Sequence, residues 1–199
     1  AAAAAGGPNP EQAAAIASPS RHILVTAGPG TGKTYTLTER LAALLAAGHD
    51  PARIAAITFT VKAAEEVRER VAQTAGGAAD GVFTGTFHQF CLDWLRRSAP
   101  GLAVVGPESR ERLLKRLFPQ AAAPERSRLA EELAAFLRSP GQPAAARIQP
   151  YLAELQRLGA IDLEAVIPEF VRRLEADAAL RQEVAGSLDH LFVDEFQDL

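Results

Sequence analysis

The sequence of 199 residues has no methionine, one cysteine, one tryptophan and no long apolar run. The single cysteine, Cys91, excludes an internal disulfide and a metal site built from several cysteines, and it is typical of a reducing, cytoplasmic setting. No segment reaches the roughly 18 apolar residues that cross a bilayer, so we expect no membrane contact. The opening alanines and glycines lack the basic flank of a signal peptide. We expect residues 1–7 to be a disordered leader or tag on a fragment of a longer protein.

The charge is small overall and uneven along the chain. A formal net charge of −3 and an isoelectric point near 5.9 give no global indication of a nucleic-acid partner. Residues 100–150 carry eight Lys/Arg against five Asp/Glu, whereas residues 151–199 carry four against eleven. The middle is therefore mildly basic and the end is acidic, which the net value hides.

Short apolar runs alternate with helical patterns in the first half of the chain. The runs at 22–28, 54–60 and 81–87 have the composition of buried strands, and each is followed by a helical period. Such alternation predicts an α/β fold with a parallel sheet and helices on both faces.

The second half of the chain has a different pattern. From about residue 100 the periods are helical and are separated by Pro or Gly, until the strand pattern LDHLFVD begins at Leu188. We predict an α/β core in two parts, 8–99 and 187–199, interrupted by an all-helical insertion at 100–186.

The loop AGPGTGKT at 27–34 follows the first strand pattern and precedes a helix. Glycines at alternate positions allow a tight turn whose N–H groups converge on a phosphate, and the helix beginning near Lys33 adds its positive end. Lys33 would reach the β- and γ-phosphates and Thr34 would bind Mg²⁺. A glycine-rich turn without function is the alternative, and the strand–loop–helix setting disfavours it. The predicted nucleotide-binding residues in this segment are Ala27, Gly28, Pro29, Gly30, Thr31, Gly32, Lys33, Thr34 and Tyr35.

The chain ends with LFVDEFQDL, an apolar strand followed by acidic residues. Asp194 would lie at the carboxyl end of the strand, where open α/β sheets bind ligands, and there it could hold Mg²⁺ directly or through water. Glu195 could then orient or deprotonate the attacking water. An acidic strand end exposed to solvent is the alternative, and the phosphate loop in the same chain makes a nucleotide site the better interpretation.

Five segments, in order, resemble the motifs of superfamily 1 DNA helicases of the UvrD/Rep/PcrA type. They are PNPEQAAAI, AGPGTGKT, ITFTVKAAEEVRERV, GTFHQF and DEFQD, and the similarity covers residues 8–97 and 187–199. Two positions depart from the family pattern: Val61 stands where Asn is frequent, and Tyr35 where Arg is frequent. The resemblance implies a RecA-like ATP-binding lobe that uses ATP and Mg²⁺ and works with a second lobe of the same protein.

The resemblance also implies roles for single residues. Gln12 would bind the adenine, Gln197 would sense the γ-phosphate, and catalysis would depend on Lys33, Glu195 and Gln197. Single-stranded DNA and its junctions with duplex would be the partner, bound by Phe59, Thr60, Lys62, Thr86 and His88. Phe59 is equally a candidate for base stacking and for the core, and a lone histidine such as His88 is more often structural.

Several alternatives stay open. Arg110, Arg112, Lys115 and Arg116 form either a solvated helix face or a patch that contacts nucleic acid. The motor on single-stranded DNA is the leading interpretation, and a helicase-nuclease of the RecB/AddA kind is a close alternative. A regulatory ATPase without nucleic acid and a degenerate, purely structural phosphate-loop domain are the others.

Overall fold

The computed structural model describes residues 7–139 and 143–198, so the predicted leader lies outside the described residues except for Gly7. The chain divides into two compact units. The core unit contains the residues up to Phe87 together with those from Glu183 onward, and the inserted unit is His88–Gln182. None of the helices in the described part of the chain is long and apolar enough to cross a membrane.

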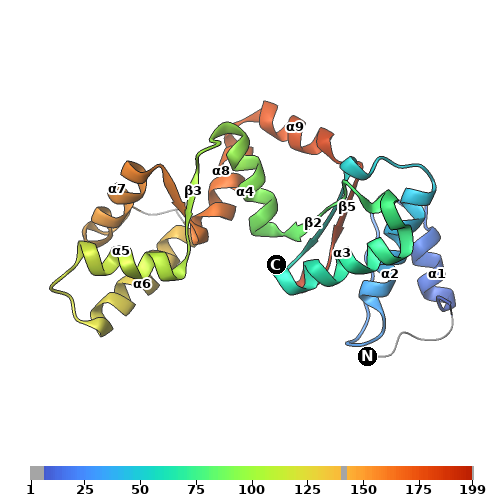
Figure 1. Ribbon diagram of the computed structural model, residues 1–199, viewed down its shortest axis with the longest axis horizontal. Helices are drawn as coiled ribbons and strands as arrows, with labels where there is room; N and C mark the ends of the chain where they lie inside the picture. The colour runs from blue at the N-terminus through green and yellow to red at the C-terminus, as the bar shows by residue number, and fades with distance from the viewer. Residues whose placement is uncertain (1–6, 140–142, 199) are drawn as a thin grey trace. The chain divides into compact units, whose positions relative to one another are not determined.

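The core unit is built on a three-stranded parallel sheet in the order β2-β1-β5 (Figure 1). The central strand β1 (Ile54–Thr58) is buried at all five positions. It pairs with β2 (Phe83–Thr86) on one side and with β5 (His190–Val193) on the other. The register sets Ile57 beside Val193, so the residues that follow β1 and β5 lie at the same carboxyl-terminal end of the sheet.

Three helices accompany this sheet: α1 (Pro10–Ala17), α2 (Lys33–Ala46) and α3 (Val61–Ala75). Asn9 begins α1 with a capping box shared with Gln12, and the Thr60 hydroxyl accepts from the Ala63 N–H to begin α3. Figure 1 shows α2 and α3 beside the strands. Their apolar faces meet β1 in one core made of Leu41, Leu45, Ile54, Ala56, Val67 and Val71.

Short 3-10 turns complete this unit: η1 (Pro51–Arg53), η2 (Gly76–Ala79) and η5 (Phe196–Asp198). The prediction of an α/β fold with a parallel sheet flanked by helices is confirmed, and the strands expected near 54–60, 81–87 and 188–194 are present.

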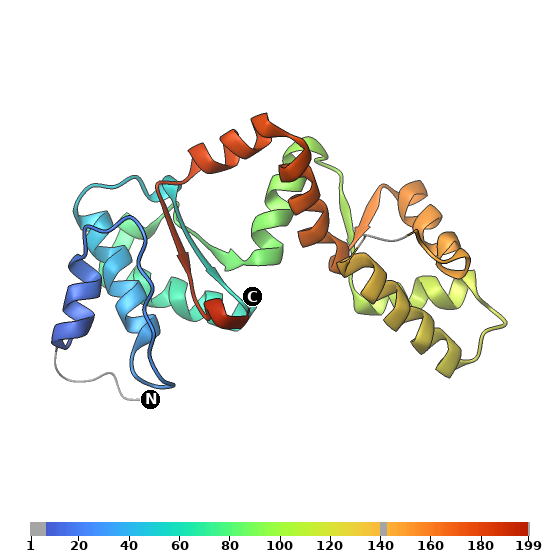
Figure 2. The same cartoon turned by 180° about the vertical axis from the view of Figure 1, so that it is seen from behind.

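The strand predicted at 22–28 is not formed, so this prediction was wrong. Ile23, Leu24 and Val25 are 38%, 77% and 42% exposed, and Figure 2 shows this blue segment as an irregular trace. A strand needs a hydrogen-bonding neighbour as well as an apolar pattern. Within the described residues, the edges of the sheet are β2 and β5, and the segment pairs with neither.

The inserted unit has its own apolar core, which includes Leu114, Leu133, Tyr151 and Leu155. Its elements are α4 (Phe87–Ser98, which starts one residue before the unit), β3 (Ala103–Val105), α5 (Pro107–Leu117), α6 (Ala123–Arg138), η3 (Ala146–Ile148), α7 (Gln149–Leu158), β4 (Ala160–Asp162), η4 (Leu163–Ala165), α8 (Val166–Ala176) and α9 (Ala178–Ser187, which ends in the core unit).

The insertion is not all-helical as predicted, because β3 and β4 form a two-stranded parallel sheet. Each of these strands has only three residues, and β4 ends in the fully buried Asp162. A strand this short has no periodic pattern to recognise, and a buried aspartate looks like a surface residue in sequence.

The contacts also divide the chain at different places from the predicted residues 100 and 186. Helix α4 belongs with the inserted unit from His88 onward. Phe90 packs edge-on against Phe170 of α8 with ring centroids 6.3 Å apart, and Arg173 donates to the Ser98 hydroxyl at 2.8 Å. The proline and glycine after α4 mark the end of a helix and not the boundary of a unit.

Candidate active site

The loop 27–34 is folded tightly on itself at the start of α2. Its glycines at 30 and 32 have φ of 74° and 92°, a region that favours glycine. The Thr31 hydroxyl donates to the Gly28 carbonyl at 2.7 Å. Gly32 has a second constraint, since a Cβ there would lie 2.8 Å from Nε2 of Gln12. Positive φ therefore favours glycine at positions 30 and 32, and at position 32 the approach of Gln12 adds a steric reason.

Lys33 is the first residue of α2, and its side chain turns back over the loop. Its Nζ donates to the Ala27 carbonyl at 3.3 Å and lies 3.8 Å from Oε1 of Glu195. The structure thus brings together the phosphate loop and the DEFQD segment from opposite ends of the chain. The Lys33 ammonium group and the Glu195 carboxylate thus face each other at the position predicted for the γ-phosphate and the attacking water.

The acidic segment continues directly from β5. The Asp194 N–H donates to the Ile57 carbonyl at 2.9 Å, which holds Asp194 at the end of the sheet. Burial raises the pKa of the Asp194 carboxyl, and the neighbouring Glu195 charge raises it further. A bound cation would counter both effects.

Glu195 has an unusual backbone conformation, with φ of 51° in the left-handed region. Its N–H donates to Oδ1 of Asp194 at 3.1 Å. Its side chain accepts a short hydrogen bond at Oε2 from the amide Nε2 of Gln197. All three predicted catalytic residues therefore lie together, with Glu195 between Lys33 and Gln197.

Gln12 lies against the same loop. Its Nε2 donates to the Thr31 carbonyl at 3.1 Å, while its Oε1 accepts from the Asn9 N–H at 2.9 Å. Each end of the amide has one contact within the protein, which orients the side chain and leaves one N–H and one lone pair for a ligand. Thr34 and Tyr35 follow Lys33 in the first turn of α2, and both are half-buried.

Arg40 links α1 to α2, a contact that the sequence did not predict. Its Nη1 donates to the Ala15 and Ile16 carbonyls at 3.0 and 2.8 Å, so it binds the last turn of α1 to α2. A helix C-terminus attracts cations, but nothing in the sequence pattern indicates which arginine supplies the charge.

The residues predicted to contact DNA have different surroundings. Phe59 is 58% exposed in the connection between β1 and α3, so it is not a core residue. Lys62 is exposed, and Thr60 is exposed while its hydroxyl caps α3. Thr86 is only 7% exposed at the end of β2, and its contact with DNA stays a prediction. His88 belongs to the inserted unit, in the first turn of α4, and is half-buried.

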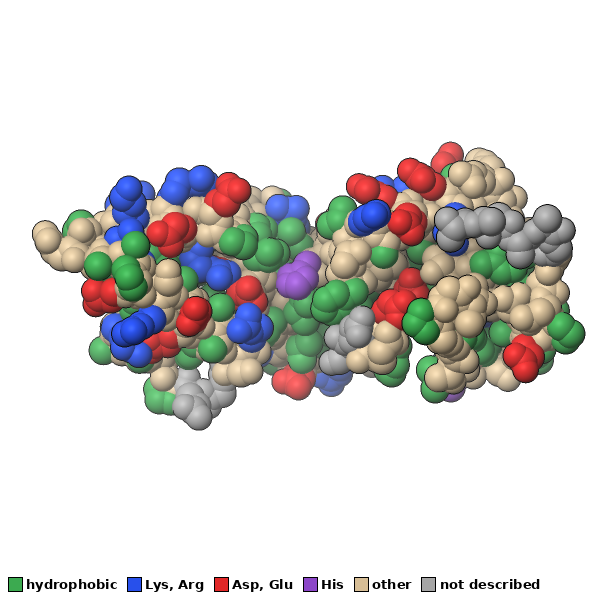
Figure 3. Space-filling model, turned by 90° about the horizontal axis from the view of Figure 1, so that it is seen from below, with side chains coloured by type: hydrophobic (Ala, Val, Ile, Leu, Met, Phe, Trp, Pro, Cys, Tyr) green, Lys and Arg blue, Asp and Glu red, His purple; other side chains and the backbone are tan. Residues whose placement is uncertain are grey.

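The basic cluster of the inserted unit is not a continuous patch. Figure 3 shows Lys and Arg interspersed with Asp and Glu on the side of the inserted unit that faces the viewer. Arg116 pairs with Glu154, and Arg112 donates to the Ser109 hydroxyl at 2.8 Å. Arg110 is 7% exposed and forms two hydrogen bonds to the buried Asp162, at 2.8 and 2.5 Å.

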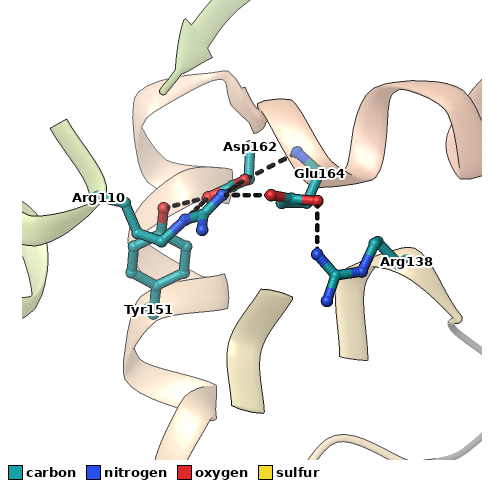
Figure 4. Close-up of polar contacts among 5 residues, drawn as sticks. All are labelled: Arg110, Arg138, Tyr151, Asp162 and Glu164. Carbon is teal, nitrogen blue, oxygen red and sulfur yellow. Dashed lines mark hydrogen bonds and ion pairs between the residues drawn. The ribbon is translucent and has the colours of Figure 1, made fainter. Parts of the chain in front are cut away.

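Figure 4 shows the polar network that surrounds this pair. Tyr151 donates its hydroxyl to Asp162 at 2.6 Å, and the Glu164 N–H donates to the same carboxylate at 3.0 Å. Arg138 in turn lies 3.0 Å from Glu164. A buried charge needs such partners, so Arg110 has a structural role in place of either surface role considered for it.

A metal ion would have few protein ligands here. Among the described residues, no group of three or more His, Cys, Asp and Glu side chains is placed to hold a metal. Mg²⁺ bound with a nucleotide usually takes one or two protein oxygens and completes its shell with waters and phosphates. The hydroxyl of Thr34 and the carboxylate of Asp194 are oxygen ligands of that kind. Burial and the Glu195 charge raise the pKa of Asp194, and a bound cation would lower it again.

The chain was compared with known protein families and proteins. The family model described as UvrD/REP helicase N-terminal domain matches residues 8–133 and 120–199. ATP-dependent DNA helicase UvrD1 of Mycobacterium tuberculosis is 34% identical over 221 residues, which cover 96% of this chain and 29% of the relative.

Two further relatives agree. UvrD1 of Mycobacterium leprae is 32% identical, with 96% of this chain and 28% of the relative covered. ATP-dependent DNA helicase PcrA of Staphylococcus aureus is 29% identical, with 96% and 30% covered. The chain thus spans less than a third of the length of these relatives, and the expected RecA-like fold and the resemblance are confirmed. By its motifs, its fold and these matches, the chain belongs to the UvrD/Rep helicase family and represents its N-terminal domain.

Proposed function

We propose that this chain is the ATP-binding lobe of an ATP-dependent DNA helicase that couples ATP hydrolysis to movement on single-stranded DNA and to strand unwinding. The observation that carries the proposal is the 3.8 Å approach of Lys33 Nζ to Glu195 Oε1. It joins the two motifs of a phosphoryl-transfer site in a chain whose relatives are named ATP-dependent DNA helicases.

The phosphates of ATP would lie in the loop 27–34, bound by its backbone N–H groups and by the positive end of α2. Lys33 would exchange the Glu195 carboxylate for the β- and γ-phosphates. Gln12 would bind the adenine edge with the remaining N–H and lone pair of its amide, and Tyr35 would lie near the base.

Thr34 and Asp194 would hold Mg²⁺, which neutralises charge on the transferred phosphoryl group. Glu195, once Lys33 has turned to the phosphates, would have a free carboxylate oxygen to orient the attacking water and to accept its proton. Because phosphoryl transfer depends on positioning and charge neutralisation, these few groups would suffice for binding but not for fast turnover.

Single-stranded DNA and its junctions with duplex would be the partner. Phe59 is exposed at the carboxyl-terminal end of the sheet, where Asp194 and Glu195 also follow their strand. Its ring could stack on a base, an interaction worth about 1–3 kcal/mol per base. Lys62, exposed in the first turn of α3, would contact a phosphate of the DNA. Thr60, the N-cap of α3, would fix the backbone between Phe59 and Lys62. His88 stays a predicted contact.

A second RecA-like lobe of the same protein would complete the site by supplying cations to the nucleotide. On its own the chain described here would bind nucleotide weakly and hydrolyse it slowly. Action in the cytoplasm belongs to the same proposal and rests on the single cysteine and the DNA partner.

The test is DNA-stimulated ATP hydrolysis by the complete protein that contains this lobe. Lys33→Ala should abolish hydrolysis while leaving the circular-dichroism spectrum unchanged. Lys115→Ala, an exposed lysine on α5, is the matched control and should leave the rate unchanged. A wild-type protein that hydrolyses ATP without stimulation by DNA, and that does not shift a labelled oligonucleotide in a gel, would instead support a regulatory ATPase.

A further inference from the structure

The carboxylate of Glu195 is held from two sides. One oxygen faces the ammonium group of Lys33 at 3.8 Å, and the other accepts the short hydrogen bond from the Gln197 amide. The contact with Lys33 must be given up when a phosphate takes that lysine. The hydrogen bond from Gln197 does not depend on the phosphate loop, because both residues belong to the same turn after β5.

The backbone around Glu195 agrees with this arrangement. Within the described residues, Glu195 is the non-glycine position with positive φ. Strained conformations of this kind persist only where the surroundings enforce them, and they are concentrated at functional sites. Here the strain turns the chain sharply after Asp194, and the 3-10 turn η5 then brings the Gln197 side chain back to Glu195.

A flexible glutamate gains from such a partner. Its side chain is 41% exposed and has several rotatable bonds, so without a partner the carboxylate would sample many orientations. A base or water-orienting group must be held close to its productive geometry. The amide of Gln197 supplies a donor to one oxygen and leaves the other free for water.

We propose that Gln197 acts through Glu195 as its positioning residue and does not sense the γ-phosphate directly. The inference rests on the proposed function and assigns a role within the same site. In the structure, one of the two amide N–H groups of Gln197 is directed at Glu195 and orients the side chain toward that carboxylate. The two roles predict different effects on binding and on turnover.

The first test separates binding from turnover in the complete protein. In Gln197→Ala, kcat for DNA-stimulated ATP hydrolysis should fall by about 10- to 100-fold, while KM for ATP stays within about twofold of wild type. The affinities of fluorescent ATP and ADP analogues, measured without turnover, should keep their wild-type ratio. A selective loss of affinity for the triphosphate would overturn the inference and restore the role of phosphate sensor.

Two further substitutions of Gln197 test whether its effect depends on the hydrogen bond to Glu195. Gln197→Glu keeps the shape but replaces the donor with a like charge, and it should lower kcat at least as far as Gln197→Ala. Gln197→Arg keeps a donor with sufficient reach and should recover part of the rate. Equal rates in all three variants would contradict a role through a hydrogen bond. Gln73→Ala, an exposed glutamine in the last turn of α3, is the matched control and should match wild type.

A double-variant cycle tests whether the effect passes through Glu195. In a Glu195→Gln background, single-turnover hydrolysis should be the same with and without Gln197→Ala. An additional loss in the double variant would show that Gln197 acts independently, and would overturn the inference. Failure of the proposed function has a different signature, since the wild-type protein itself would then bind no ATP or show no stimulation by DNA.

Discussion

At the scale of single residues, Gly32 is the position of the phosphate loop where a side chain would be most unfavourable. Its φ of 92° disfavours any side chain, and a Cβ would lie 2.8 Å from the Gln12 amide. Gly32→Ala should destabilise the chain by about 1–2 kcal/mol and weaken nucleotide binding, because Gln12 must move away from the Thr31 carbonyl. Thermal unfolding and titration with a fluorescent ATP analogue measure the two effects.

Gly28 provides the control for that prediction. Its nearest neighbour for a new Cβ is the Thr31 methyl at 3.8 Å, an ordinary contact distance, and its φ is not positive. Gly28→Ala should therefore unfold at nearly the wild-type temperature. If both variants lose the same stability, the steric account of Gly32 is wrong.

The residue scale also shows how far the sequence could be interpreted. The spacing of Lys33, Thr34, Asp194 and Glu195 predicted a site built from both ends of the chain, and the structure brings Lys33 and Glu195 together. The contact of Gln12 with the Thr31 carbonyl and the contact of Arg40 with α1 could not be predicted. They depend on which side chains the tertiary fold brings within reach, and a linear pattern does not contain that information.

At the scale of elements, two polar pairs join the start of β5 to the segment that precedes β1. Arg53 donates to both carboxylate oxygens of Asp189 at 2.7 Å. The rings of His49 and His190 meet edge to face, with Nδ1 and Nε2 3.1 Å apart. One of these nitrogens must be unprotonated to accept the hydrogen bond, so the pair requires at least one neutral ring.

This pairing predicts a dependence of stability on pH. Burial lowers the pKa of His190, and the nearby His49 and Arg40 lower it further, although Asp189 opposes them. A histidine pKa that is lower in the folded state stabilises the fold above the unfolded value of about 6.5, and this stability is lost as the pH falls. The free energy of unfolding should therefore decrease between pH 7 and pH 5, as measured by urea denaturation.

Two features isolate the histidine contribution. The hydrogen bond from Arg53 lowers the pKa of Asp189, so this aspartate contributes stability that is lost only as the pH falls below about 4. His190→Gln should flatten the curve between pH 5 and pH 7, whereas His22→Gln in the exposed segment should leave its slope unchanged. An unchanged slope in His190→Gln would contradict the proposed cause.

The elements themselves were predicted unevenly. Amphipathic periods predicted the long helices α2 and α3, and apolar runs predicted β1, β2 and β5. An apolar run at 22–28 did not become a strand, because strand formation depends on a neighbour that the pattern does not reveal. The three-residue strands β3 and β4 went unrecognised for the opposite reason, since tertiary packing formed them without a pattern.

At the scale of the whole molecule, each unit has its own apolar core, and the inserted unit adds a buried polar network. Removing one partner of a buried ion pair leaves the other uncompensated, with a cost of about 3–5 kcal/mol. Asp162→Ala should therefore destabilise the inserted unit by roughly that amount. Nucleotide affinity should stay within about twofold of wild type, because the loop 27–34 and Glu195 belong to the core unit.

Chemical denaturation followed by fluorescence of Trp94, which lies in the inserted unit, reports the stability change. Arg138→Ala removes only the exposed outer contact to Glu164, and its effect should be below about 1 kcal/mol. A large loss of ATP affinity in Asp162→Ala would contradict the separation of the two cores.

The unpaired segment at 22–28 has a consequence for behaviour in concentrated solution. Leu24 is 77% exposed, and Leu191 on the edge strand β5 is 56% exposed. Among the described residues β5 is an edge strand, and an edge strand with exposed aliphatic side chains is a template for a neighbouring chain that native proteins usually block with charge. Preparations of this chain should form oligomers that grow with concentration in light scattering, and Leu24→Lys should suppress them. The apolar residues at 22–28, which form no strand within the chain, would then promote self-association between molecules.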